Sequence, residues 1–310
     1  MRYYYTRDTL FVRGNFSAAS TGIHGGVRKV STIFNHTVPA DFPEPDPFGY
    51  LERLIAREGF GPDFFGLLTA VDMQHLCILH FDFIAVFITA GVQQEAEKSH
   101  TINIIVLSSQ GLAPGAQLEA IITVSGAKAE ALGCLGYACT GTPTDAVVIA
   151  CEGKEMHEFA GPVSEAGKRI HDAVQFGVQE AIRRHEGRIE RKTPSMFIFS
   201  RYGGDHWVEW KAEGCPYYPC HFAGQRCELC YCPFYPCRDV DLGEDVESIG
   251  GGTVWSCSRC MLMHRPEVVD YVLEHPEAPL GELKKIHGRI PGSRSMGKTK
   301  PRKKKGKKLP

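Results

Sequence analysis

The cysteines of this 310-residue chain are distributed very unevenly, because eight of the 12 lie between Cys215 and Cys260. Two C-x-x-C pairs occur among them, Cys227 with Cys230 and Cys257 with Cys260. Two thiols at this spacing can bind one metal ion from a tight turn, and a structural zinc site needs four such ligands. So short a segment has too few residues to fold on an apolar core alone, so the sequence predicts a small metal-stabilised module near the C-terminal end.

The spacing of these thiols also predicts how they share metal ions. Two C-x-x-C turns that face each other are typical of a zinc ribbon, so one four-thiol set is predicted as Cys227, Cys230, Cys257 and Cys260. The other thiols would form a second set, Cys215, Cys220, Cys232 and Cys237, with His221 or His264 as substitutes. We expect one or two structural zinc ions, with an iron–sulfur cluster as the alternative. A zinc ion held by four thiolates has no open position for water, which argues against a catalytic metal.

A disulfide framework is the competing interpretation of the same cysteines. The chain opens MRYYYTRDTL, without the apolar segment of a signal peptide, so we expect a cytoplasmic protein. In that compartment such spacing is more typical of metal binding than of disulfides. The most apolar stretch, residues 76–92, is interrupted by His80 and Asp82, so buried strands are expected there and no membrane span.

Charge is distributed unevenly as well. The net charge is −1, yet residues 291–310 hold nine Lys and Arg side chains and no acidic one. This tail has few apolar residues to bury, so we expect it to be disordered, serving either to contact nucleic acid or an acidic surface or only to aid solubility. The sequence predicts three parts: a body over residues 1–190, a cysteine-rich domain over residues 191–288 and a basic tail over residues 289–310.

The body mixes strand and helix signals. Apolar and β-branched runs predict strands over residues 27–35, 66–71, 77–89, 101–107 and 146–151, with the second and third as neighbours. Helical periodicity predicts helices over residues 50–58, 163–185 and 266–274. Residues 112–132 carry both signals, with a break expected at Gly126. The fold class is therefore α+β, a sheet covered by helices in the body plus the small cysteine-rich domain.

The body carries none of the strong short catalytic motifs, so candidates come from polar residues at strand ends and in glycine-rich loops. The TGIHGG turn supplies Gly22, Gly25 and Gly26, whose backbone can approach a bulky ligand or present N–H groups to an oxyanion. A hairpin turn that needs positive φ is the alternative. His36 could transfer a proton near neutral pH and Asn35 could orient a substrate, although structural hydrogen bonding explains either residue.

Three further candidates are acidic, hydroxyl or amide side chains. Asp72 follows a predicted strand and could serve as a base, or could cap a helix. The loop after residue 139 offers Thr142, Thr144 and Asp145 to the amide or hydroxyl groups of a ligand, although the same residue types are common turn caps. Asn103 lies inside an apolar strand, where its amide must find partners, so it is either a structural link or a ligand contact.

Seven segments of the body resemble, in the same order, those of the adenosylcobinamide amidohydrolase family (CbiZ). They lie between residues 21 and 150, within a likeness that covers about residues 15–185, and read TGIHGG, NHTVP, GLLTAVDM, ITAGV, HTINIIVL, AKAEAL and TGTPTDAVVIA. Each is short, but seven in register are specific. The stretch from residue 197 through the cysteines looks like the small cysteine-rich domain that is fused to archaeal members of this family.

The resemblance implies an amidohydrolase of corrinoid salvage. Such an enzyme hydrolyses the amide that joins the aminopropanol side chain of adenosylcobinamide to the corrin ring, giving adenosylcobyric acid and 1-amino-2-propanol. A corrinoid is then the small-molecule substrate, and coenzyme B12 synthesis is the pathway served. A cleft with glycine-rich and hydroxyl-bearing loops and apolar walls suits so large a ligand.

Two segments depart from the family pattern. Residues 93–96 read Gln-Gln-Glu-Ala where an Asn-Ala pair is expected, and residues 125–128 read Ser-Gly-Ala-Lys where Thr-Glu-Ala-Lys is expected. Because that glutamate is missing, we assign proton transfer to His36 and Asp72, and substrate orientation to Asp145. A non-catalytic corrinoid-binding protein is the alternative. Zinc-dependent nucleic-acid binding is disfavoured, since the helix after the cysteines is acidic. The sequence does not indicate the oligomeric state.

Overall fold

The computed structural model describes residues 1–92, 101–189, 192–200, 204–211, 215, 218–230, 232–247 and 253–289. The chain forms two compact units, Met1–Glu213 and Gly214–Pro310. The basic tail expected from residue 289 onward falls almost wholly outside the described residues, as do residues 93–96. None of the helices in the described ranges has both the length and the apolarity that a membrane span requires.

The first unit contains one large sheet and three helices. Its strands are β1 (Arg2–Tyr5), β2 (Thr9–Ser20), β3 (Gly26–Thr37), β4 (Phe64–Thr69), β5 (Cys77–Phe81), β6 (Ile84–Ala90), β7 (Ile102–Ser108), β8 (Gly111–Leu112), β9 (Ala146–Cys151), β10 (Glu155–His157), β11 (Ser195–Ser200) and β12 (His206–Trp210). Its helices are α1 (Pro47–Arg57), α2 (Pro114–Cys134) and α3 (Glu165–His185), with a short 3-10 turn η1 (Met73–His75).

The large sheet has the strand order β12-β11-β5-β6-β7-β9-β2-β3-β4, and β1 pairs with β2 outside this path. Three pairs, β11 with β5, β7 with β9 and β3 with β4, are parallel, and the others are antiparallel. Residues 191–213, which the sequence analysis placed in the cysteine-rich domain, supply β11 and β12 to this sheet.

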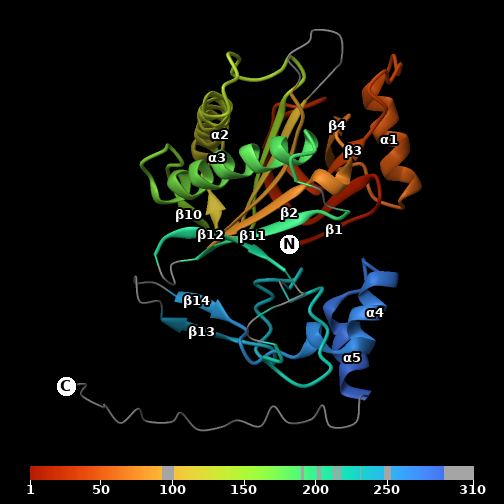
Figure 1. Cartoon of the computed structure of the whole chain (residues 1–310). Helices are drawn as coiled ribbons and strands as arrows, with labels where there is room; N and C mark the ends of the chain where they lie inside the picture. Colours follow the sequence, from red (N-terminus) through yellow and green to blue (C-terminus); the bar gives the residue numbers. More distant parts are fainter. Residues whose placement is uncertain are drawn as a thin grey trace, which may run out of the picture. The chain divides into compact units, whose positions relative to one another are not determined.

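The sheet is strongly coiled, so that strands distant in its order meet across its inner face. One apolar cluster joins residues of β2, β3 and β4 to residues of β5, β6, β7 and β9. A second cluster packs the outer face of β5, β6, β7 and β9 against α2 and α3. A third packs α1 on the far side of β3 and β4. Figure 1 shows α2 and α3 on one side of the sheet and α1 on the opposite side.

The helices confirm most of the sequence predictions. Helix α3 begins after Ser164, whose side chain accepts a hydrogen bond from the Gly167 N–H at 3.0 Å, and its predicted apolar face is buried. Residues 112–132, where two signals competed, form the single helix α2, and the break expected at Gly126 is wrong. Gly126 lies on the exposed side, while the buried side of α2 packs on the sheet, and this packing outweighs the strand propensity of residues 121–124.

The predicted neighbours over residues 66–71 and 77–89 are also corrected. Strand β4 lies at one edge of the sheet, and β5 lies far from it, between β11 and β6. The second segment is a hairpin, because Asp82 adopts φ of 52° and turns the chain between β5 and β6. Hydrophobic runs alone do not report such a tight turn.

The second unit is small. It holds a hairpin of β13 (Glu244–Glu247) and β14 (Thr253–Ser256), the turn η2 (Leu262–His264), and helices α4 (Pro266–Glu274) and α5 (Leu280–Arg289). The helix predicted over residues 266–274 is confirmed. One small apolar cluster centres on Leu262, Met263 and Val268, and several of the cysteines pack against it.

Candidate functional site

A cavity of about 400 Å³ opens in the first unit where several strand ends meet. The segments around it precede β7 and β9, follow β3 and β4, and include the turn after β2. These strands come together because β7 and β9 are parallel neighbours and because the coiled sheet brings the end of β4 onto β7. The cavity therefore draws on most of the segments that the sequence analysis singled out.

Its lining is mostly apolar and includes a few polar groups. The apolar side chains include Ile23, Val38, Phe42, Leu67 and Pro143. The polar lining residues are threonines and one acid, namely Thr21, Thr69, Thr101, Thr144 and Asp145. Among the described residues that line the cavity, Asp145 is the only ionisable one. Apolar walls with a few convergent polar groups are typical of a small-molecule site.

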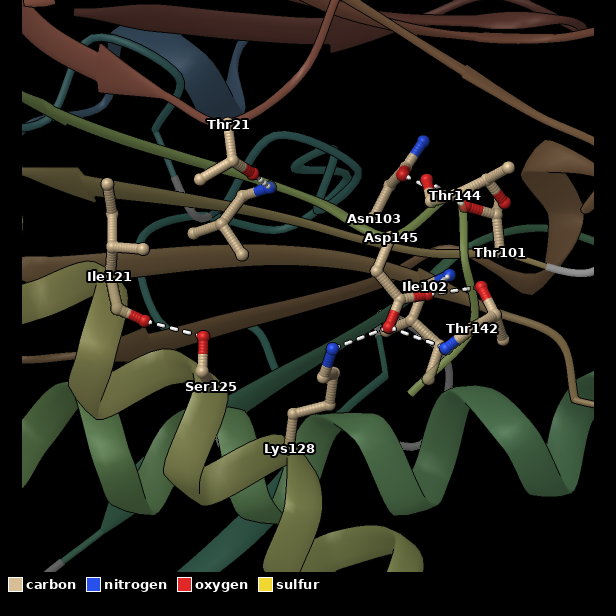
Figure 2. Close-up of polar contacts among 11 residues, drawn as sticks. Thr21, Thr101, Ile102, Asn103, Ile121, Ser125, Lys128, Thr142, Thr144 and Asp145 are labelled. Atoms are coloured by element: carbon tan, nitrogen blue, oxygen red, sulfur yellow. Dashed lines mark hydrogen bonds and ion pairs between the residues drawn. The ribbon is translucent and has the colours of Figure 1, made fainter. Parts of the chain in front are cut away.

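Four donors converge on the Asp145 carboxylate, as Figure 2 shows. Its Oδ1 accepts from the Ile102 N–H at 2.9 Å and from the Thr142 hydroxyl at 2.5 Å. Its Oδ2 accepts from the Thr142 N–H at 3.0 Å and from the Lys128 ammonium at 2.5 Å. Hydrogen bonds to an ionised acceptor are the strong ones, so this carboxylate is held firmly in one position.

Lys128 is the residue that the sequence analysis missed. It is the one basic residue of α2, and its side chain reaches from the helix to Asp145 (Figure 2). Both side chains are largely buried, with exposed fractions of 12% and 10%. Gly141 covers the pair so closely that a Cβ there would lie 2.3 Å from the Asp145 carboxylate and 2.5 Å from the Lys128 nitrogen. The available signal was that Lys128 is the single cation of this helix.

A buried amide network lies beside the cavity. Asn103 donates from Nδ2 to the Asn35 side-chain oxygen at 2.9 Å and to the Leu68 carbonyl at 2.8 Å. Asn35 in turn donates to the Thr89 hydroxyl at 2.8 Å. Both asparagines are at most 2% exposed, and neither lines the cavity. They link β3, β4, β6 and β7, which is the structural role considered for Asn103.

The TGIHGG turn contributes to the cavity only in part. Gly22 lines it, whereas Gly25 and Gly26 do not. Gly25 packs against backbone, since a Cβ there would lie 2.2 Å from the Ser20 carbonyl oxygen, and Gly26 has φ of 102°. Thr142 also lies outside the lining and acts on it through Asp145. The hairpin geometry alone therefore explains why glycine occupies the last two positions of the turn.

His36 and Asp72 both lie outside the described lining of the cavity. His36 bonds to the Thr9 hydroxyl at 2.7 Å through Nδ1 and to the Tyr50 hydroxyl at 2.9 Å through Nε2. Burial lowers the pKa of His36, although the carboxylate of Asp8 acts against this. Asp72 is exposed and caps η1, where its Oδ1 accepts from the Gln74 N–H at 2.9 Å.

In the second unit, the eight clustered cysteines are free thiols, as are the other four of the chain. Their chemistry suits a thiophilic metal ion such as zinc, and the Gln225 amide already donates to two of the sulfurs. Among the described residues, however, no three Cys, His, Asp or Glu side chains are placed closely enough to hold one ion. The thiols are gathered in one module without forming a closed site.

Comparisons with known proteins divide the chain in two. Residues 3–190 match the family model described as adenosylcobinamide amidohydrolase, and residues 206–287 match one described as a cysteine-rich small domain. An adenosylcobinamide amidohydrolase of Methanosarcina mazei is 39% identical over 195 residues, which cover 59% of this chain and 98% of that protein. An uncharacterized protein of Methanocaldococcus jannaschii is 56% identical over 59 residues, which cover 19% of this chain and 50% of that protein.

Proposed function

Because this chain belongs to the adenosylcobinamide amidohydrolase family, we propose that it hydrolyses the side-chain amide of adenosylcobinamide. The products are adenosylcobyric acid and 1-amino-2-propanol, so the reaction serves corrinoid salvage. The observation that carries the proposal is the cavity of about 400 Å³, with apolar walls and a group of threonines around one fixed carboxylate. The enzyme is an amidohydrolase, and its substrate is a corrinoid.

The size of the cavity suggests which part of the substrate it takes. A corrin ring with its adenosyl ligand is larger than this space, whereas the aminopropanol arm and its amide fit within it. We propose that the arm enters beside Thr101 and Thr144 and that the ring rests on the apolar rim around Val38, Phe42 and Pro143. Hydroxyls and a carboxylate in the lining of the cavity can bind the amide and the alcohol of the arm.

Asp145 is proposed to orient the substrate. Both of its oxygens already accept hydrogen bonds from protein donors, so its role is to present a fixed charge rather than to remove a proton. Lys128 is proposed as a positioning residue, because it contacts Asp145 and is outside the described lining of the cavity. Positioning of this kind is worth a large share of a catalysed rate, since small displacements misalign the reacting groups.

The assignment of proton transfer to His36 and Asp72 stays a prediction. Each lies two residues from a residue that lines the cavity, Val38 in the first case and Ala70 in the second. Substituting each with alanine tests it, because loss of a general acid or base lowers the rate by about 10²–10⁴-fold. Turnover within a few-fold of the unsubstituted enzyme in both variants would assign proton transfer to other residues.

The function itself is tested with the purified chain and adenosylcobinamide. We expect release of 1-amino-2-propanol and appearance of adenosylcobyric acid, separated chromatographically, alongside a characterised family member as the positive control. A spectral change of the corrinoid on binding, without product, would instead support a non-catalytic corrinoid-binding protein.

We also propose that the thiols of the second unit bind structural zinc. The support is their donor chemistry and their match to the cysteine-rich small-domain family. The bounds of the three predicted parts, the cytoplasmic location and the absence of a nucleic-acid partner stay predictions. Zinc bound to four thiolates has no open position for water, so the proposed hydrolysis takes place in the first unit.

A further inference from the structure

Four of the clustered thiols surround one small cavity in the second unit. A space of about 50 Å³ is lined by Cys232, Cys237, Cys257 and Cys260, together with Cys230 and apolar side chains. Three of the four, all except Cys257, also pack against the apolar cluster around Leu262. These four thiols are therefore mutual neighbours.

Two of the other four thiols contact one side-chain amide. The Gln225 side-chain amide donates to the Cys220 sulfur at 3.2 Å and to the Cys227 sulfur at 3.3 Å. The Cys230 N–H donates to the Cys227 carbonyl at 3.1 Å. This turn holds the Cys230 thiol near that of Cys227. Cys215 is the remaining clustered thiol, and it is absent from the lining of the small cavity.

This grouping differs from the zinc-ribbon arrangement predicted by spacing. In a ribbon, the two C-x-x-C turns face each other, so Cys227 and Cys257 share an ion. Here the first C-x-x-C turn lies with the thiols that precede it, and the second lies with Cys232 and Cys237. The difference arises because the core of the unit takes in Cys232, Cys237 and Cys260 but does not include the first four thiols.

We infer that the cysteine-rich unit holds two zinc ions in sequential sets, the first bound by Cys215, Cys220, Cys227 and Cys230 and the second by Cys232, Cys237, Cys257 and Cys260. Each ion would be held by four thiolates, whose protons pass to the solvent on coordination, and the sulfurs would have to move closer together than they now lie. The inference rests on the proposed zinc binding and does not depend on the proposed amide hydrolysis.

Two double substitutions in the full-length chain give opposite results for the two arrangements. Cys227→Ser with Cys257→Ser removes one ligand from each sequential set, but two ligands from a single ribbon set. Cys215→Ser with Cys227→Ser removes two ligands from the first sequential set, but one ligand from each ribbon set. Zinc per chain is measured by mass spectrometry after anaerobic purification, and the cobalt-substituted forms are compared by visible absorption. We expect two ions in the unsubstituted chain, none in the first variant and one in the second.

Retention of one ion by the first variant and none by the second would overturn the sequential arrangement, as would bound iron with sulfide or fewer than two ions in the unsubstituted chain. A variant whose second unit fails to fold would lose all metal, so a second measurement uses the unsubstituted chain. Cadmium-edited NMR should correlate each cadmium signal with the β-protons of one sequential set. One signal coupled to both Cys227 and Cys257 would refute it. Turnover measured on the same sample reports separately on the hydrolase proposal.

Discussion

The two units of this chain use different means to hold a fold together. The first buries large apolar clusters on both faces of its sheet and links the buried amides of Asn35 and Asn103 by a hydrogen bond. Among its described residues, the second has one cluster of seven buried apolar residues, against which three of its thiols pack. Apolar burial contributes about 25 cal/mol per Å². A cluster of this size therefore adds little to the folding free energy of the second unit. The first unit is therefore a conventional domain, and we expect the second to depend on metal bound by its thiols.

Removing metal should separate the two units most clearly. Structural zinc contributes about 10–16 kcal/mol of apparent folding free energy in small zinc domains. A strong chelator should therefore unfold the second unit and leave the first folded. Hydrogen exchange would then accelerate in α4 and remain slow in β7. Equal acceleration in both elements, or in neither, would contradict the division.

The Lys128–Asp145 pair tests whether the first unit contains the site. Asp145→Asn and Lys128→Met should each lower kcat/KM for adenosylcobinamide by about 10²-fold, because the carboxylate is lost in one variant and displaced in the other. Glu130→Gln, an exposed substitution on the same helix, is the matched control and should leave turnover unchanged. Retention of metal in all three variants would show that the effect is confined to the first unit.

Glu209 tests how far along the chain the first unit extends. Arg184 is 1% exposed, and its guanidinium lies 3.3 Å from the Glu209 carboxylate on β12. Glu209→Gln leaves this buried charge without its anion, so we expect a loss of about 3 kcal/mol in the free energy of unfolding of the first unit. Lys211→Ala removes the exposed partner of the same carboxylate and should cost less than about 1 kcal/mol. Urea denaturation of both variants, followed by the fluorescence of the tryptophans, would measure the difference.

Acidification should weaken the first unit through His80. Burial lowers its pKa to about 4, below the value of about 6.5 in an unfolded chain. The unfolded state then binds more protons between these values, so stability is complete above pH 6.5 and is lost as the pH falls towards 4. We expect a loss of about 3 kcal/mol over this window, since each pKa unit is worth about 1.4 kcal/mol. His80→Gln should flatten the pH profile of thermal unfolding, and an unchanged slope would assign the pH dependence to other groups.

Local patterns in the sequence predicted much of this structure, and long-range packing explains the rest. The apolar periodicity of residues 163–185 and the cap at Ser164 sufficed for α3, because a helix is defined by neighbours in sequence. The position of β4 far from β5 depends on how the whole sheet coils, which no local pattern records. For the same reason Asp145 could be named in advance, while its partner Lys128, 17 residues earlier on a helix, could not.

The thiol grouping shows the same limit within a shorter segment. Spacing identified all eight cysteines. Which of them would share an ion depends on which of them pack against the apolar cluster around Leu262. Asn103 is a further case, since its burial in a strand was evident, whereas its bonds to Asn35 and Leu68 depend on the coiling of the sheet.

Strand β12 has a consequence for how such chains can be recombined. Its residues, His206–Trp210, lie inside the span that matches the cysteine-rich family, yet they pair with β11 in the sheet of the first unit. A graft that transferred the cysteine-rich module by its family limits would carry away an edge strand of the donor, together with Trp207 and Glu209. A functional chimera should therefore be joined after residue 211. Strand β12 then stays with β11, with which it pairs in the sheet of the first unit.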